Sequence, residues 1–136
     1  MTTAFDEAGE FQPDKVAAQV NWMIRAGAHG LAAGGSTGEG HTLDHDEYRA
    51  LIAATSEAVA GRIPVIAGVI TDSTREAIKR GKAVRDMNVA ALQVAPVHYL
   101  FRPTDDAMVD HFRAMADETG VPIIIYNVVP WTYLSP

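Results

Sequence analysis

Four short apolar runs recur along the chain, and their spacing limits the folds that it can adopt. They occupy residues 31–35 (LAAGG), 64–69 (PVIAGV), 91–96 (ALQVAP) and 122–127 (PIIIYN). Successive runs begin about 30 residues apart, which is the length of one strand with its following helix. A continuous apolar stretch such as residues 123–125 is typical of a strand buried on both faces by helices. The pattern therefore predicts a parallel sheet covered by helices.

Helical patterns fill the intervals between these runs. In the helix predicted over residues 13–26, the inward stripe consists of Val16, Val20, Met23 and Ile24. In the helix predicted over residues 44–60, it consists of Tyr48, Leu51, Ile52, Thr55 and Val59. A third helix is expected to begin at Ser73, where Glu76 completes a capping box, and a fourth after Thr104, with Met108, Phe112 and Met115 facing inward. Gly27, Gly61 and Gly120 each follow a helical stretch as expected C-caps.

The element order leaves two architectures open. With residues 2–5 taken as the tail of a first strand, the chain holds five strands and four helices, and right-handed crossovers place the strands in one parallel sheet. The sheet is either a complete doubly wound one or the first part of a (β/α)₈ barrel, which needs about 250 residues. Met1 lies almost inside this predicted first strand, and only VVPWTYLSP follows the last strand. Both ends favour an α/β fold that is an incomplete TIM barrel. It would form one domain over residues 1–136, which holds strands one to five and lacks strand six onward.

Composition excludes several classes of function. The net charge of −6 and the pI near 5.2 offer no basic patch for nucleic acid. Cysteine is absent, which suits a reducing compartment, and the acidic start and lack of an apolar run of about 18 residues predict no signal peptide and no membrane span. We expect a soluble, cytoplasmic protein.

The histidines do not form a metal motif. His41 and His45 are four residues apart, but no HExxH surrounds them, and surface or capping roles are expected for them and for His29, His98 and His111. We therefore expect no metal and no cofactor.

Ligands of both candidate architectures bind beyond the carboxyl ends of the strands. Residues 34–39 (GGSTGE) follow one such end. Glycines there let backbone amides approach an anion, and the hydroxyls of Ser36 and Thr37 suit a carboxylate or a proton relay. The motif lacks the Gly-Lys-Ser/Thr ending of a P-loop, which disfavours nucleoside triphosphates. A turn required only for its geometry is the alternative.

Two further strand ends carry polar or aromatic side chains. Residues 96–103 (PVHYLFRP) follow one predicted strand, and Tyr126 follows the last. A tyrosine at such a position serves either as an acid/base group or as an amphipathic plug. Lys15, Lys79 and Lys82 all fall on helical segments, so the chain offers no lysine for a Schiff base at a strand end.

Four motifs occur together in one order: GGSTGEGHTLDHDEYRAL, GRIPVIAGV, PVHYLFRP and IIIYNVVP. In this combination, from about Thr3 to Pro130, the chain resembles the dihydrodipicolinate synthase / N-acetylneuraminate lyase family. The resemblance implies a TIM barrel that binds pyruvate or another 2-oxo acid as a Schiff base on a lysine of strand six, and that adds it to an aldehyde or cleaves it from one. It also implies no cofactor and a homo-oligomer, a tetramer or a dimer.

The resemblance assigns roles to individual residues. Ser36 and Thr37, with Gly35, would bind the pyruvate carboxylate, Ser36 would relay protons, and Tyr126 would be the general acid/base. The loop PVHYLFRP is about two residues longer than the family's, so either Tyr99 or His98 takes the place of the relay tyrosine. Glu39 would brace the loop.

The Schiff-base lysine is expected beyond Pro136, which would leave this chain inactive and poorly stable alone. Two alternatives stay open. One is a dehydratase or deaminase of the same family, acting on a 2-oxo sugar acid or a cyclic imine acid. The other is a non-catalytic α/β module that binds an anion or a partner protein.

Overall fold

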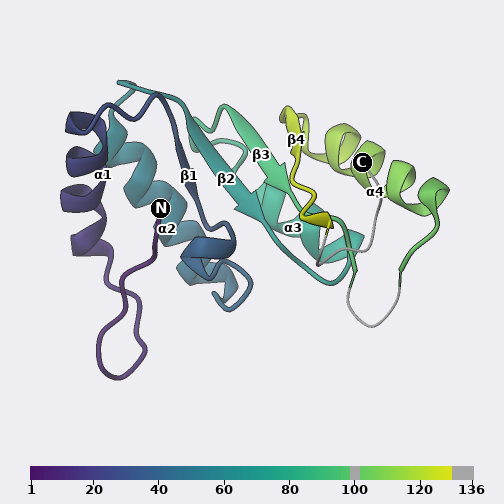
Figure 1. Cartoon of the computed structure of the whole chain (residues 1–136), viewed down its shortest axis with the longest axis horizontal. Helices are drawn as coiled ribbons and strands as arrows, with labels where there is room; N and C mark the ends of the chain where they lie inside the picture. Colours follow the sequence, from purple (N-terminus) through teal and green to yellow (C-terminus); the bar gives the residue numbers. More distant parts are fainter. Residues whose placement is uncertain (99–101, 130–136) are drawn as a thin grey trace.

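A parallel sheet of four strands forms the centre of the molecule (Figure 1). The computed structural model describes residues 1–98 and 102–129. The strands are β1 (Leu31–Ala33), β2 (Val65–Val69), β3 (Ala91–Val94) and β4 (Ile123–Ile125), and they lie side by side in the order β1-β2-β3-β4. All three pairings are parallel, with Ala33 opposite Ala67, Gly68 opposite Gln93 and Val94 opposite Ile125.

The strand order decides between the two predicted architectures. A doubly wound sheet starts near its middle and reverses direction, whereas a barrel adds each strand beside the one before it. Here the order follows the chain, and neighbouring helices contact one another along the series from α1 to α4. The prediction of a partial (β/α)₈ barrel is therefore confirmed.

The predicted strand over residues 2–5 is wrong. The Met1 amino group donates a hydrogen bond to Ala32 O (2.8 Å), but the next residues turn back on themselves: Asp6 N donates to Glu10 O (3.0 Å) and Gln12 N to Ala4 O (2.9 Å). Phe5 makes only an isolated antiparallel bridge with Phe11. Ala4 O and Asp6 N pair within this local hairpin, and the described sheet has four strands rather than five.

The helices lie where the apolar periodicity predicts them. A 3₁₀ turn, η1 (Pro13–Lys15), leads into α1 (Val16–Arg25), and α2 (His45–Val59), α3 (Thr74–Val84) and α4 (Asp105–Thr119) follow. All five residues of the predicted stripe on α2 are buried, as are Val16, Val20, Met108 and Met115. None of these helices has the length and apolar character needed to cross a bilayer.

Two helix starts differ in detail from the prediction. The complete capping box belongs to α2: Asp44 Oδ1 accepts from Glu47 N (2.8 Å), and Glu47 Oε2 accepts from Asp44 N (2.9 Å). At α3, Ser73 Oγ accepts from Glu76 N (3.2 Å), but the Glu76 carboxylate lies toward Arg80, 3.9 Å from its Nε. The Ser73 capping box is thus half formed, because the acidic partner has a cation beside it.

Burial of the strands also departs from the expected pattern at one edge. Strands β1, β2 and β3 are largely buried, but Ile124 and Ile125 of β4 are 43% and 57% exposed. In the described sheet β4 has a neighbour on one side only. The apolar run of residues 123–125 therefore forms the predicted strand, but in this chain the strand is not buried on both faces.

His111 is buried rather than on the surface. Its side chain, in α4, is 2% exposed, and its Nδ1 lies 2.9 Å from Thr74 Oγ1 of α3. Burial lowers the pKa of His111, and a weaker interaction with the Ala95 backbone acts the other way. The neutral imidazole is the form that the folded chain favours.

We expect His111 to make stability depend on pH. Because its pKa in the folded chain is below the ordinary value of about 6.5, the unfolded chain binds a proton that the folded chain does not. The free energy of unfolding should therefore fall as the pH drops through about 6.5, by at most about 1.4 kcal/mol per pH unit, and level off below the folded pKa.

Urea unfolding of wild type, His111→Gln and His29→Gln between about pH 7.5 and pH 5 tests this. The His29 variant, changed at an exposed position, should follow the wild type, and the His111 variant should lose less stability. Parallel curves for all three proteins would refute the assignment.

Candidate functional site

A pocket lies where the carboxyl ends of the four strands meet. Its volume is about 260 Å³, and each strand supplies two wall residues: Ser36 and His41 after β1, Ile70 and Asp72 after β2, Ala95 and His98 after β3, and Tyr126 and Val128 at the end of β4. Parallel strands bring their carboxyl ends to one edge, and barrel enzymes carry their sites at that edge. Of the predicted site residues, Ser36, His98 and Tyr126 line this pocket.

The Gly-rich loop after β1 forms a short 3₁₀ turn, η2 (Ser36–Gly38). Gly35 precedes it in an extended conformation, and its carbonyl accepts from Gly38 N (3.0 Å). Ser36 is half-buried in the pocket wall, whereas Thr37 is exposed and, like Gly35, is not part of that wall. Gly35 and Thr37 therefore flank the residue that faces the pocket.

The loop packs against β2 backbone to backbone. A Cβ atom added to Gly68 would lie 2.6 Å from the carbonyl of Gly34 and from the amide of Gly35, and one on Gly40 would lie 1.8 Å from Gly34 O. Gly34 itself has φ +69°. Only glycine permits this approach, so the glycines let the loop fold onto the sheet.

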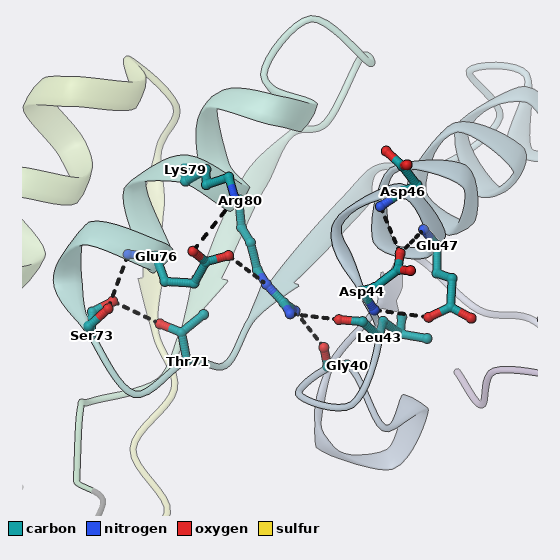
Figure 2. Close-up of polar contacts among 10 residues, drawn as sticks. All are labelled: Gly40, Leu43, Asp44, Asp46, Glu47, Thr71, Ser73, Glu76, Lys79 and Arg80. Atoms are coloured by element: carbon teal, nitrogen blue, oxygen red, sulfur yellow. Dashed lines mark hydrogen bonds and ion pairs between the residues drawn. The ribbon is translucent and has the colours of Figure 1, made fainter.

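Arg80, for which the motifs predict no role, binds the other end of the loop (Figure 2). It projects from α3, is 7% exposed, and donates from Nη1 to Gly40 O (2.5 Å) and from Nη2 to Leu43 O (2.8 Å). A signal was present in the sequence: Arg80 shares the inward helical stripe of Ala77, Gly81 and Val84. A cation in such a stripe needs partners in the interior.

Tyr48 of α2 lies behind the loop. It is fully buried; its ring is 3.1 Å from the position of a Gly34 Cβ, and the Arg80 guanidinium lies 5.1 Å from its centroid. Burial raises the pKa of Tyr48 far above its ordinary value, an effect that the Arg80 charge opposes only in part. Tyr48 is therefore a neutral support for the loop rather than a proton carrier.

The far side of the pocket comes from β3 and β4. Tyr126 N donates to Val94 O (2.8 Å). This bond continues the ladder by one residue and fixes the backbone position from which the Tyr126 side chain extends. His98 Nδ1 lies 2.9 Å from Pro96 O. A carbonyl only accepts, so Nδ1 carries a proton and Nε2 is the remaining acceptor of a neutral ring. Tyr99, the other candidate relay residue, lies outside the described residues.

Among the residues that the structure describes, no lysine lines the pocket. Lys15, Lys79 and Lys82 are exposed on helical segments and pair with the acidic side chains of Asp14, Glu76 and Glu118. Over residues 1–98 and 102–129, no three His, Cys, Asp or Glu side chains are grouped to hold a metal ion. The described pocket thus offers hydroxyl, phenol, imidazole and carboxylate groups.

Sequence comparison places the chain in a family. The profile of the dihydrodipicolinate synthetase family matches residues 1–134. The chain belongs to this family. The 4-hydroxy-tetrahydrodipicolinate synthase of Rhizobium meliloti is 38% identical over 128 residues, which cover 94% of this chain and 43% of the relative. That of Methylobacterium radiotolerans is 43% identical over 112 residues, or 82% of this chain and 37% of the relative.

Solved structures agree with the sequence relatives. The dihydrodipicolinate synthase of Bacillus anthracis has a TM-score of 0.93 and 32% identity, covering 99% of this chain and 46% of that one. A chloride-inhibited synthase from Acinetobacter baumannii, complexed with pyruvate, has a TM-score of 0.92 and 32% identity, covering 98% of this chain and 45% of that one. A sialic acid aldolase from Ruminococcus gnavus, 19% identical, shares the fold. The chain spans less than half the length of these relatives and corresponds to their amino-terminal part.

The contact between β2 and the loop predicts unequal effects of two glycine substitutions. Gly68→Ala places a methyl group 2.6 Å from the loop backbone and should lower the free energy of unfolding by about 1–3 kcal/mol. Gly35→Ala meets nothing within 4 Å, and φ is −81° there, so it should be close to neutral. Denaturant unfolding of both variants measures the difference, and equal stabilities would contradict the described packing.

Proposed function

We propose that this chain supplies the carboxylate-binding and proton-transfer side of a lyase site that handles pyruvate or another 2-oxo acid. In the whole protein, a lysine from a later strand would form the Schiff base, as in a 4-hydroxy-tetrahydrodipicolinate synthase. Residues 1–136 would then be one partial barrel domain. One observation carries the proposal: the Ser36 hydroxyl and the Tyr126 phenol come from opposite edges of the sheet and line one pocket.

The β1 loop suits the carboxylate of a 2-oxo acid. Hydroxyls are donors to carboxylates, and such charge-assisted hydrogen bonds are stronger than neutral ones. Ser36 lines the pocket, and Thr37 follows it at an exposed position. The pocket of about 260 Å³ has room for a three-carbon acid beside a second small reactant.

Tyr126 suits the proton transfers of imine formation. When an amine adds to the 2-oxo carbon, the carbonyl oxygen becomes a hydroxyl that must leave as water. A phenol supplies the proton for that departure and takes one back in the reverse step. Ser36, on the opposite wall, would relay the proton to and from the carboxylate side. The iminium that results is an electron sink for making or breaking the adjacent carbon–carbon bond.

His98 is one of the two candidates for the relay position, and Tyr99 is the other. The Nδ1 of His98 is held by Pro96 O, and the side chain lies in the pocket wall with Tyr126. In the resulting tautomer Nε2 is the hydrogen-bond acceptor. An acceptor at this position suits the sharing of a proton with a phenol. Asp72 and His41 complete the polar part of the wall and would face the second reactant.

Family membership weighs against a non-catalytic module, and borohydride trapping tests the lyase directly. This chain and one extended through the reading frame after Pro136 are incubated with pyruvate and borohydride, and intact mass is measured. We expect an adduct of one pyruvate, less one water and plus two hydrogens, on the extended chain only. A folded extended chain without an adduct would overturn the proposal.

Substitution of Tyr126 tests its role in the same assay. In the extended chain, Tyr126→Phe should slow trapping by about 10²- to 10⁴-fold, because the proton donor for imine formation is lost. Tyr48→Phe is the matched control, since the Tyr48 hydroxyl is buried outside the pocket wall. A Tyr126 variant that traps pyruvate at the control rate would remove Tyr126 from the mechanism.

A further inference from the structure

Arg80 is a buried cation that the proposed chemistry does not use. It lies outside the wall of the 260 Å³ pocket, yet its side chain is directed from α3 at the loop that carries Ser36 (Figure 2). A buried charge is costly unless it is well paired, and apolar residues of similar size often stabilise a fold at least as well. The contacts of Arg80 therefore need an explanation other than stability.

The guanidinium bridges two carbonyls on one turn of the loop. Nη1 donates to Gly40 O and Nη2 to Leu43 O, at 2.5 and 2.8 Å. The planar fork of arginine fixes two acceptors at once, which a lysine ammonium on a flexible stem does not. Between these two residues lies His41, which forms part of the pocket wall. Arg80 thus sets the path of the loop on both sides of a pocket residue.

Hydrogen bonds lead from this bridge to Ser36. Gly40, whose carbonyl Arg80 holds, donates from its own amide to Gly35 O (3.1 Å), and Gly35 immediately precedes Ser36. Glu39 N also donates to Ser36 O (3.1 Å). Because Gly40 packs on Gly34 without room for a Cβ, movement at Gly40 is passed to the backbone around Ser36.

Arg80 is itself held in place from two sides. Glu76, one turn earlier on α3, has Oε1 3.9 Å from Arg80 Nε, and the Tyr48 ring lies under the guanidinium at 5.1 Å. Tyr48 also supports Gly34 on the other side of the loop. One connected group, running from α3 to α2, therefore determines where the loop sits.

We propose that Arg80 is a positioning residue for ligand binding: it holds residues 34–43 in the conformation that presents Ser36 and Thr37 to the carboxylate. This inference rests on the proposed function of the loop, but its structural part stands apart from the identity of the ligand. Loss of Arg80 should loosen the loop and weaken carboxylate binding while the sheet stays folded.

Three variants separate positioning from general stability. Arg80→Met keeps the apolar stem and removes the fork, Arg80→Lys keeps the charge without bridging both carbonyls, and Arg85→Met removes an exposed arginine at the end of the same helix. Amide hydrogen exchange is measured by NMR on this chain, and the pyruvate concentration for half-maximal borohydride trapping is measured on the extended chain.

We expect Arg80→Met to raise that pyruvate concentration about tenfold, with a smaller change in the maximal trapping rate. Arg80→Lys should lie between it and the wild type, and Arg85→Met should match the wild type. The Gly38 and Gly40 amides should exchange about tenfold faster in Arg80→Met, whereas the β2 amides keep their protection.

The remaining outcomes also decide the matter. An unchanged half-maximal concentration in a folded Arg80→Met protein overturns the proposal, and if that variant does not fold, Arg80→Lys decides in the same way. If the wild type traps no pyruvate, the proposed function fails, and loop exchange alone judges Arg80: faster exchange at Gly38 and Gly40 supports positioning, and unchanged exchange overturns it.

Discussion

The contact of Gly68 with the backbone of Gly34 and Gly35 is the constraint on which the site depends. A Cβ atom on Gly68 would lie 2.6 Å from the backbone of Gly34 and Gly35, so strand β2 has to meet the loop after β1 as bare backbone. That approach lets the loop turn sharply and return over the sheet end, where Ser36 reaches the pocket. The loop is a separate segment in sequence, but in space it belongs to the sheet.

A buried cation binds the other end of the same loop. Arg80 is buried, and two backbone carbonyls, the Glu76 carboxylate and the Tyr48 ring surround it. Each partner compensates part of the cost of removing a cation from water. The arrangement joins α2, α3 and the loop into one unit, so the position of a pocket side chain depends on helices that do not touch the ligand.

Periodicity alone predicted the helices and the four strands of the described sheet, because apolar spacing reports directly on which face is covered, but it left the barrel and the doubly wound sheet both open. The prediction was wrong at two places where a local interaction replaces the expected one. Residues 2–5 pair with residues 6–12 in a hairpin instead of forming a strand, and Glu76 pairs with Arg80 instead of completing a capping box. It also missed the burial of His111 and the role of Arg80, since partners from distant segments determine both. Ser36 and Tyr126 were predicted as site residues from motifs, and the structure brings them to one pocket; their roles in chemistry remain a prediction.

The central claim is that a 2-oxo acid binds between the β1 loop and Tyr126. The most direct measurement is a pyruvate titration of this chain, labelled with ¹⁵N and followed by NMR. The account predicts that the largest shift changes fall on the amides of Gly35, Ser36, Thr37 and Tyr126. Shift changes concentrated at the opposite end of the sheet, around Ser56 and Arg62, or none at any pyruvate concentration, would contradict it.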